Sequence, residues 1–199
     1  MPLYFYPNRP TLVPPDPVNP MTPAPDFINS LEASGKYVAE QKWNGDNCLV
    51  YTTEMQLWNR HHARLAYRPT PEMLAALSTF PRGSLINGEL VNSKTKTVKN
   101  LLVVHCVMQW AGQLMNGKPW GESRFLLEKH FQEHDMGSQV VLSKIWHTGF
   151  WDLYQAADGA IIEGIVLKDP RGKIQLSTTP LADVNWMLKI RKPCKKYQF

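Results

Sequence analysis

The chain has 199 residues and a mass of 22.8 kDa, which is enough for one sizeable hydrophobic core. Hydrophobic residues make up 43% and charged residues 20%, a balance that is typical of a folded globular protein and excludes a disordered one. The formal net charge of +5 is compatible with a phosphate-rich partner. No apolar run could span a bilayer and the first ten residues do not resemble a signal peptide, so we expect a cytoplasmic protein without a membrane partner.

The first predicted feature is a proline-rich arm. Nine of the sixteen prolines fall between Pro2 and Pro25. Proline lacks the amide donor that helices and central strands need, so residues 1–30 are predicted to run as an extended arm. Residues 31–199 are then predicted to form a single domain.

Short apolar runs separated by Asn, Gly and Asp turns follow from residue 36 onward, as expected for antiparallel strands. Predicted helices interrupt them at residues 71–80, 122–134 and 149–157, the first with a capping Thr70 before Pro71. Together these patterns predict an α+β fold with mainly antiparallel sheets and flanking helices. The predicted strands cover residues 36–43, 48–53, 84–91, 101–108, 139–146, 160–169 and 184–191.

The segment EQKWNGDN, residues 40–47, is the first chemically unusual feature. By the hairpin rules alone it is a tight Asn-Gly turn between two strands. That interpretation explains Asn44 and Gly45 but gives Lys42 no role. A single lysine beside a turn is most often a solvated charge.

Further segments give Lys42 a context, because the set resembles the ordered motifs of the covalent nucleotidyltransferases: DNA ligases, RNA ligases and mRNA capping enzymes. EQKWNGDN resembles their KxDGxR element. In the family's order there follow LWNRH with Arg60, a weaker match, then SLINGELV with Glu89, IIEGIVLKD with Glu163 and Lys168, and WMLKIRK with Lys189 and Arg191. Each match alone is weak, but the ordered set spans Glu40 to Arg191.

This resemblance implies a ligase-type nucleotidyltransferase fold in which Lys42 is the catalytic nucleophile and forms lysyl-AMP from ATP. It implies that Glu163, with Glu89, binds a Mg²⁺ or Mn²⁺ ion. Glu40 matches the position at which DNA ligases accept a hydrogen bond from the adenine amino group, which favours ATP over GTP. His105 lies where the family stacks an aromatic ring on the purine, although a buried His105 without a ligand is equally compatible. The nucleotide-binding residues implied are Glu40, Asn47, Arg60, Glu89, His105, Lys168, Lys189 and Arg191.

The chemistry also explains these residue types. A lysine amine attacks only when deprotonated, and neighbouring cations or burial favour that form. Lys168 and Lys189 would supply such cations, and the same charges would stabilise the α-phosphate as pyrophosphate leaves. Magnesium prefers carboxylate and phosphate oxygens, which fits Glu163.

Departures from the family pattern affect the choice of substrate. Asn47 replaces the arginine of KxDGxR, as in the KxHGxN variant of editing-type RNA ligases, and favours RNA. Glu40 and the NGELV strand favour DNA ligases. Only eight residues follow Arg191, so we expect no OB-fold domain in this chain.

We therefore predict an ATP-dependent polynucleotide ligase, active in nucleic-acid repair, that joins 3′-OH and 5′-phosphate ends, with RNA somewhat favoured. The alternatives are an ATP-dependent DNA ligase on nicked duplex, a GTP-dependent capping-type guanylyltransferase, and a catalytically silent nucleic-acid-binding module. The oligomeric state stays open. The residues predicted to contact the nucleic-acid backbone are Lys94, Lys96, Lys99, Lys192, Lys195 and Lys196.

Overall fold

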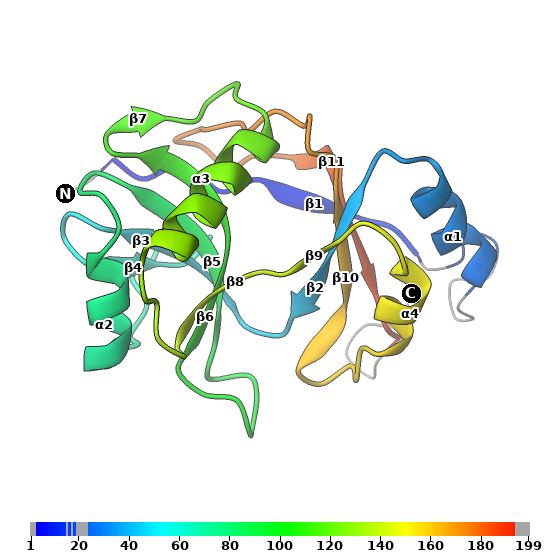
Figure 1. Ribbon diagram of the computed structural model, residues 1–199, viewed down its shortest axis with the longest axis horizontal. Coiled ribbons are helices and arrows are strands. Elements are labelled where there is room, and N and C mark those ends of the chain that lie inside the picture. The colour runs from blue at the N-terminus through cyan, green and yellow to red at the C-terminus, as the bar shows by residue number, and fades with distance from the viewer. Residues whose placement is uncertain (1–2, 15, 17, 19–23, 194–199) are drawn as a thin grey trace. The chain divides into compact units, whose positions relative to one another are not determined.

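The structure of the protein is a computed structural model that describes residues 3–14, 16, 18 and 24–193 (Figure 1). The chain divides into two compact units. Unit 1 is formed from residues 1–8, 45–143 and 173–182, and unit 2 from residues 9–44, 144–172 and 183–199. The motif at residues 40–47 is therefore divided, with residues 40–44 in unit 2 and residues 45–47 in unit 1.

Unit 2 is built on a sheet with the strand order β1-β11-β10-β2-β9. Neighbouring strands are antiparallel, except that the edge strand β1 runs parallel to β11. An edge position suits β1 because Pro10 lacks an amide to donate to a second neighbour. The strands are β1 (Arg9–Leu12), β2 (Val38–Trp43), β9 (Ile145–Trp146), β10 (Ile162–Lys168) and β11 (Asp183–Arg191).

The hydrophobic core of unit 2 lies between this sheet and two helices, α1 (Pro25–Ala33) and α4 (Phe150–Gln155) (Figure 1). Glu32 of α1 accepts hydrogen bonds from the amides of Gly149 and Phe150, at 3.0 and 2.8 Å. A carboxylate at the first amides of α4 stabilises that helix end. The fully buried core residues are Ile28, Ala39, Phe150, Ile165, Leu167 and Ile190, with Tyr154 and Leu153 almost completely buried.

Unit 1 contains a second sheet, with the order β4-β3-β5-β6-β7, and a short strand β8 that runs parallel to β6. Its other neighbouring strands are antiparallel. The strands are β3 (Asp46–Tyr51), β4 (Gln56–Trp58), β5 (Leu85–Val91), β6 (Leu101–Trp110), β7 (Gln113–Leu114) and β8 (Val140–Leu142).

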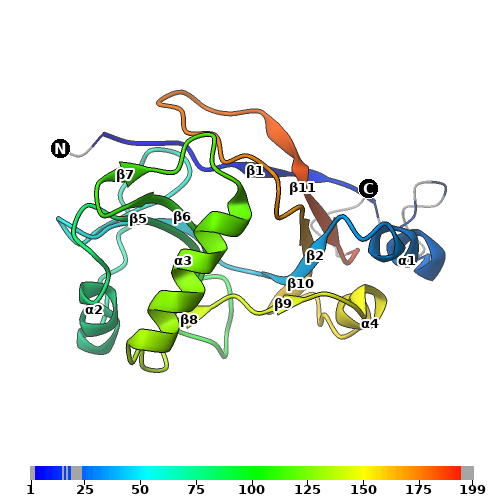
Figure 2. The same ribbon diagram turned by 45° about the horizontal axis from the view of Figure 1, so that its top comes forward.

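Two helices belong to unit 1, α2 (Pro71–Ser78) and α3 (Trp120–Glu133), and Figure 2 shows α3 alongside β6. The hydroxyl oxygen of Thr70 accepts a hydrogen bond from the amide of Met73 at 3.1 Å, so the predicted N-cap of α2 is confirmed. Trp120 and Leu127 are buried where α3 packs on the unit.

The observed elements follow the predicted ones closely, with three differences. Residues 139–146 were expected to form one strand, but they form β8 and β9 in different sheets, because the chain leaves unit 1 after Ser143. Helix α1 begins inside the segment predicted as an extended arm, with Pro25 in its first turn. The short strands β4 and β7 are further additions, whereas the division into an arm and one domain stays a prediction.

Candidate active site

The strand register of unit 2 brings the predicted catalytic residue Lys42 and several predicted nucleotide-binding residues onto one face of its sheet. Lys42 lies opposite Gly164, and Gly164 lies opposite Arg191. In the next row, Glu40 lies opposite Val166, and Val166 lies opposite Lys189. Directly opposed residues of antiparallel strands project to the same face, so two rows of polar side chains cross three strands. The alternate residues face the hydrophobic core.

Lys42 forms an ion pair with Glu163, and the Nε atom of Arg191 lies 3.5 Å from the same carboxylate oxygen. Strict alternation would place Glu163 on the opposite face from Lys42, because Glu163 precedes Gly164. The register between β2 and β10 shifts between Ile162 and Gly164, which marks a β-bulge at Glu163. A bulge redirects a side chain, so it accounts for the contact between Glu163 and Lys42.

Gly164 occupies the middle of the Lys42 row, at φ +148°. A Cβ atom added there would overlap the carbonyl oxygen of Ile190 and lie 3.0 Å from the Cα atom of Arg191. Only glycine allows β10 and β11 to approach this closely.

Lys168 and Glu40 form a second ion pair, with 2.8 Å between Nζ and Oε2. Both side chains are only 4% exposed. The Oε1 atom of Glu40 is buried and has no hydrogen-bond partner among the described residues. Glu40 therefore has one oxygen held by Lys168 and a second that is left as a free acceptor.

Lys189 donates a hydrogen bond to the carbonyl oxygen of Pro10 at 2.7 Å, and Nζ lies 3.7 Å from Asp183. Partial burial lowers the pKa of Lys189. Asp183 acts in the opposite direction, while the charges of Arg191, Arg9 and Lys42 lower the pKa further. Lys189 is therefore close enough to Lys42 and Arg191 for their charges to act on it.

In unit 1 the structure places Asn47 and Glu89 opposite each other on β3 and β5. The side-chain amide of Asn47 donates to Asn87 Oδ1 at 2.8 Å, and its own Oδ1 is buried without a hydrogen-bond partner among the described residues. Glu89 accepts a hydrogen bond from the amide of Gly45 at 3.1 Å. An added Cβ at Gly45 would lie 2.8 Å from the Cγ atom of Glu89, so glycine allows this contact.

The remaining predicted nucleotide contacts also lie in unit 1. Arg60 is exposed, and its Nε atom donates to His61 at 3.3 Å. His105 is half-buried on β6, and its carbonyl oxygen accepts a hydrogen bond from the indole of Trp120 at 3.1 Å. The roles of these two residues in nucleotide binding stay predictions.

The lysines predicted to bind nucleic acid make contacts within the chain. Lys94 donates to the carbonyl oxygen of Gly45 at 2.5 Å and pairs with Asp46 at 3.0 Å. Lys99 donates to two carbonyl oxygens of its own loop, and Lys192 donates to the carbonyl oxygen of Gln155 at 2.8 Å. Lys96 is exposed, and Lys195 and Lys196 lie outside the described residues.

Sequence reasoning missed two aspartates that shape these surfaces. Asp158 accepts hydrogen bonds from the amides of Ala160, Ile161 and Ile162 and so fixes the turn that precedes Glu163. Burial would raise the pKa of Asp158, but these hydrogen bonds lower it below its usual value. Asp183 is the second, as the ionic partner of Lys189. An Asp-Gly pair at residues 158–159 was the only signal available for the first.

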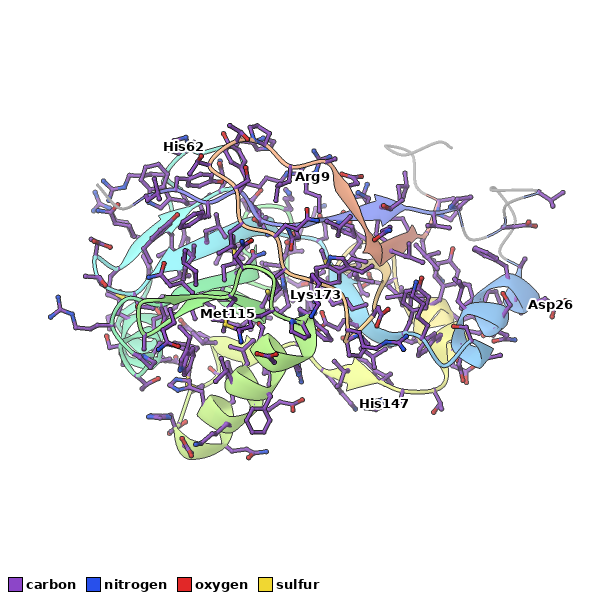
Figure 3. All side chains as sticks on the ribbon, turned by 90° about the horizontal axis from the view of Figure 1, so that it is seen from above. Arg9, Asp26, His62, Met115, His147 and Lys173 are labelled. Atoms are coloured by element: carbon purple, nitrogen blue, oxygen red, sulfur yellow. The ribbon has the colours of Figure 1, made fainter. Side chains whose placement is uncertain are left out.

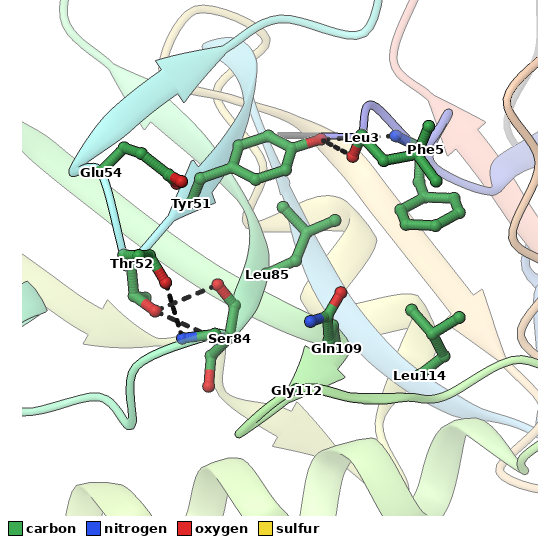
Figure 4. A pocket seen from close by; sticks show the side chains of 12 residues that line it. Leu3, Phe5, Tyr51, Thr52, Glu54, Ser84, Leu85, Gln109, Gly112 and Leu114 are labelled. Atoms are coloured by element: carbon green, nitrogen blue, oxygen red, sulfur yellow. Dashed lines mark hydrogen bonds between the residues drawn. The ribbon is translucent and has the colours of Figure 1, made fainter. Parts of the chain in front are cut away.

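A pocket of about 420 Å³ lies at the opposite end of β3 from Asp46, next to Tyr51 and Thr52 (Figure 4). The hydroxyl of Tyr51 accepts a hydrogen bond from the amide of Phe5 and donates one to the carbonyl oxygen of Leu3, which fastens the N-terminal segment over its rim. None of the predicted site residues lines this pocket. It is therefore separate from the predicted nucleotide site.

The predicted metal ligand Glu163 provides one carboxylate, whose partners in this structure are the Lys42 ammonium and the Arg191 guanidinium. Among the described residues no group of three or more His, Cys, Asp or Glu side chains could hold a metal ion alone. Magnesium is often held by one or two carboxylates together with substrate phosphates, and Glu163 supplies one such carboxylate beside Lys42.

In the described part of the chain, no helix has the length and apolar character needed to cross a membrane.

No protein-family model and no curated protein matches this sequence. Solved structures do match its fold. The ligase domain of M. tuberculosis LigD is 14% identical with a TM-score of 0.63, over 93% of this chain and 60% of that chain. Chlorella virus DNA ligase-adenylate is 12% identical with a TM-score of 0.53, over 94% of this chain and 69% of that chain.

The chain has the fold of the nucleotidyltransferase domain of ATP-dependent DNA ligases. The ATP-dependent DNA ligase from bacteriophage T7, in a complex with ATP, agrees at a TM-score of 0.52 and 12% identity, over 93% of this chain and 68% of that chain. At such identities the likeness to these ligases shows the fold alone. The chain spans about half the length of other ligases that it matches, such as 54% of a mycobacterial DNA ligase D complexed with ATP and MES. The predicted absence of an OB-fold domain stays a prediction.

Proposed function

We propose that the protein is an ATP-dependent polynucleotide ligase that acts through a lysyl-AMP intermediate on Lys42. The observation that carries this proposal is the contact of Lys42 with Glu163 and the proximity of Arg191 to the same carboxylate. Both contacts lie on the polar face of the unit 2 sheet. The ligase fold supports the same reaction class.

The first step is the attack of Lys42 Nζ on the α-phosphorus of ATP. A P–N bond forms, the bond from the α-phosphorus to the bridging oxygen breaks, and pyrophosphate leaves with that oxygen. Lys42 must first lose a proton and its contact with Glu163, because only the free amine has a lone pair for attack. Lys189 and Arg191 are placed to stabilise the charge on the α-phosphate and on the departing pyrophosphate.

A magnesium ion would add a further positive charge against the phosphates, with Glu163 as its carboxylate ligand. The protein's own residues orient the reactants. The bulge at Glu163 directs its carboxylate to the face of Lys42, and Gly164 allows β11, which carries Lys189 and Arg191, to lie close to β10. Glu89 in unit 1 remains a second candidate ligand on the basis of its sequence match.

Two later steps complete the ligase reaction. A 5′-phosphate oxygen of the nucleic acid attacks the phosphorus of lysyl-AMP, so the P–N bond breaks and AMP is transferred to the 5′ end. A 3′-hydroxyl then attacks the 5′-phosphate, a phosphodiester bond forms, and AMP is released. Each step exchanges one bond to phosphorus for another and requires no redox partner.

Glu40 supports adenine as the base. Its Oε1 atom is a buried acceptor without a hydrogen-bond donor among the described residues, which carries a free-energy cost unless a ligand supplies one. The amino group of adenine is such a donor, whereas guanine presents a carbonyl oxygen at that position. This argues for ATP and against the capping-type reaction with GTP.

Labelling with α-³²P-ATP tests the nucleophile. The wild-type chain should acquire label that resists denaturation, and Lys42→Ala should acquire none while its circular dichroism spectrum is unchanged. Lys36→Ala is the matched control, because it removes an exposed lysine from the same unit and should label normally. Label on Lys42→Ala would disprove the assignment.

The identity of the nucleic acid requires a separate panel. Asn47 favours RNA, whereas the Chlorella virus and bacteriophage T7 enzymes of similar fold are DNA ligases. Nicked DNA, nicked RNA and mixed duplexes, each with a 5′-phosphate, should be incubated with the full chain and ATP. We expect sealing of at least one nicked duplex, and product from an RNA nick would establish an RNA ligase.

A further inference from the structure

The segment between Glu54 and Glu72 in unit 1 carries positive charge with no acidic residue to balance it. It contains three arginines, Arg60, Arg64 and Arg68, all exposed. Two exposed histidines, His61 and His62, lie in the same stretch. In contrast, the loop lysine Lys94 donates to a carbonyl oxygen and pairs with Asp46, and the loop lysine Lys99 donates to carbonyl oxygens.

Residues 57–65 of this segment form a hydrogen-bonded hairpin that starts at the edge strand β4, and Arg68 follows the hairpin in the chain. The amide of Asn59 donates to the carbonyl oxygen of Ala63 at 2.8 Å, and the amide of Leu65 donates to that of Leu57 at 2.9 Å. The side chain of Asn59 also accepts hydrogen bonds from the amides of His61 and Ala63. Arg60 and Arg64 are therefore carried on a tight turn whose position is fixed.

An aromatic base holds the tip of the hairpin. The ring of Tyr4 stacks on that of His62 at a centroid distance of 4.3 Å, and its hydroxyl donates to the carbonyl oxygen of Asn59 at 2.7 Å. His62, labelled in Figure 3, adopts φ +62°, a conformation that costs roughly 1–2 kcal/mol for a residue with a Cβ atom. Trp58 and Tyr4 are buried beneath it. The contacts of Tyr4 thus hold His62 in a strained backbone conformation, and such strain is often found at functional surfaces.

Arg64 and Arg68 differ from Arg60 in their surroundings. Arg60 lies near Asp46. Burial would raise the pKa of the Asp46 carboxyl group, but contacts with Ser93 and Lys94 lower it below its usual value, and the charge of Arg60 lowers it further. No ion pair involves Arg64 or Arg68 within the described residues. Exposed guanidinium groups without a carboxylate partner are available to phosphate, which arginine can bind through two parallel hydrogen bonds.

We propose that the hairpin surface formed by Arg60–Arg68 binds the phosphodiester backbone of the nucleic acid, with Arg64 and Arg68 as its principal contacts. The absence of carboxylates favours a polyanion, and the preformed turn reduces the ordering cost of binding. This inference rests on the proposed ligase function and deepens it by naming residues of unit 1 that contact the backbone of the substrate.

The test is the salt dependence of binding by the full chain, measured by fluorescence anisotropy with labelled nicked DNA and nicked RNA duplexes. Arg64→Ala/Arg68→Ala should lower affinity and reduce the slope of log K against log salt by about two, since each lost phosphate contact removes about one. The control Arg82→Ala/Lys129→Ala removes the same charge from other exposed positions of unit 1 and should retain the wild-type slope.

A slope equal to that of wild type for both duplexes would overturn the proposal. An equal decrease in the salt slope on both duplexes supports recognition of the phosphodiester chain that they share. A decrease on one duplex alone also supports the proposal and identifies that duplex as the substrate. Labelling of Lys42 with α-³²P-ATP should be unchanged in the Arg64→Ala/Arg68→Ala variant. If the wild-type chain does not label but the variant still loses salt-dependent binding, the ligase proposal fails and the binding surface stands.

Discussion

Lys168 reaches Glu40 across the unit 2 sheet, with 2.8 Å between ammonium and carboxylate and both side chains 4% exposed. Burying each charge costs desolvation free energy, and the attraction between the two charges offsets that cost only while both partners are present. The pair therefore couples the last residue of the EGIVLK strand to the first residue of the EQK segment.

We expect Lys168→Met to destabilise the protein by about 3–5 kcal/mol, because it leaves the Glu40 carboxylate buried without its cation. The double variant Lys168→Met/Glu40→Gln should recover most of this loss, since no buried charge remains. Urea denaturation of the wild type, both single variants and the double variant measures the coupling. Equal destabilisation by the single and double Lys168 variants would show that the pair is not coupled.

Glu40→Gln should weaken the preference for ATP over GTP. The amide keeps the size of the carboxylate but can donate a hydrogen bond to the guanine carbonyl oxygen, which the carboxylate repels. Competition between labelled ATP and GTP in the Lys42 labelling assay measures the ratio. An unchanged ratio, with the stability loss accounted for, would mean that Glu40 does not contact the base.

Glu163→Gln should reduce lysyl-AMP formation roughly 100-fold, because the carboxylate that would face the metal and phosphates is lost. Both Glu163 and Lys42 are largely but not fully buried, at 16% and 15% exposure of their side chains, so the fold should tolerate the change. The rate of labelling, followed with thermal unfolding, separates the two effects. Normal labelling at saturating magnesium would exclude Glu163 from the reaction.

Gly164→Ala should destabilise the protein by at least about 1–3 kcal/mol, because the new methyl group overlaps the backbone of β11. Gly159→Ala is the matched control, since Gly159 also has a positive φ but has no atom within 4 Å of an added Cβ. Its cost should be about 1 kcal/mol from backbone strain alone. A Gly164→Ala variant no less stable than Gly159→Ala would contradict the close approach of the two strands.

Unit 1 should lose stability as the pH falls from about 6.5 to about 4. Burial, together with the charge of His134, lowers the pKa of His130 to about 4, while Glu133 acts in the opposite direction. In the unfolded chain His130 takes up a proton near pH 6.5, so between the two values the unfolded state holds more protons and stability rises with pH. The effect should be roughly 1–3 kcal/mol.

His130→Phe tests this pH dependence, because the phenyl ring can keep the stacking on Phe80, which is 4.1 Å away between ring centroids, without titrating. Its free energy of unfolding should vary less between pH 4 and 6.5 than that of the wild type. His61→Gln, at an exposed position, should behave as the wild type does. Identical pH profiles for His130→Phe and the wild type would exclude His130 as the source.

Much of the site could be predicted from the sequence because its motifs lie within strands. Lys189 and Arg191 are two residues apart on one predicted strand, so the alternation of side chains places them on the same face, as it does Glu40 and Lys42. Glu163 reaches the face of Lys42 only through a bulge. The partners of individual charges could not be predicted in this way. Lys168 was expected to act beside Lys42, but it pairs with Glu40, because the register places it nearer the other end of β2.

Local irregularities and long-range pairings were also beyond sequence reasoning. The bulge at Glu163 depends on how β10 pairs with β2, and no residue pattern marks it. The ion pair between Asp183 and Lys189 could not be predicted, since the distance between the two side chains depends on the path of β11. The parallel pairing of β1 with β11 joins segments more than 170 residues apart, and the prolines alone indicated only an extended chain.

The pairing of β1 with β11 places residues near the beginning of the chain, Arg9–Leu12, next to the strand that carries Lys189 and Arg191. Pro10 accepts a hydrogen bond from the Lys189 ammonium, and the amide of Val13 donates to the Lys189 carbonyl oxygen at 3.0 Å. A protease that removed the residues up to and including Val13 would break the hydrogen bond of the Lys189 ammonium and that of the Lys189 carbonyl oxygen at once. These few residues thus help to hold the Lys189 side chain in place, although they lie far in sequence from every predicted motif.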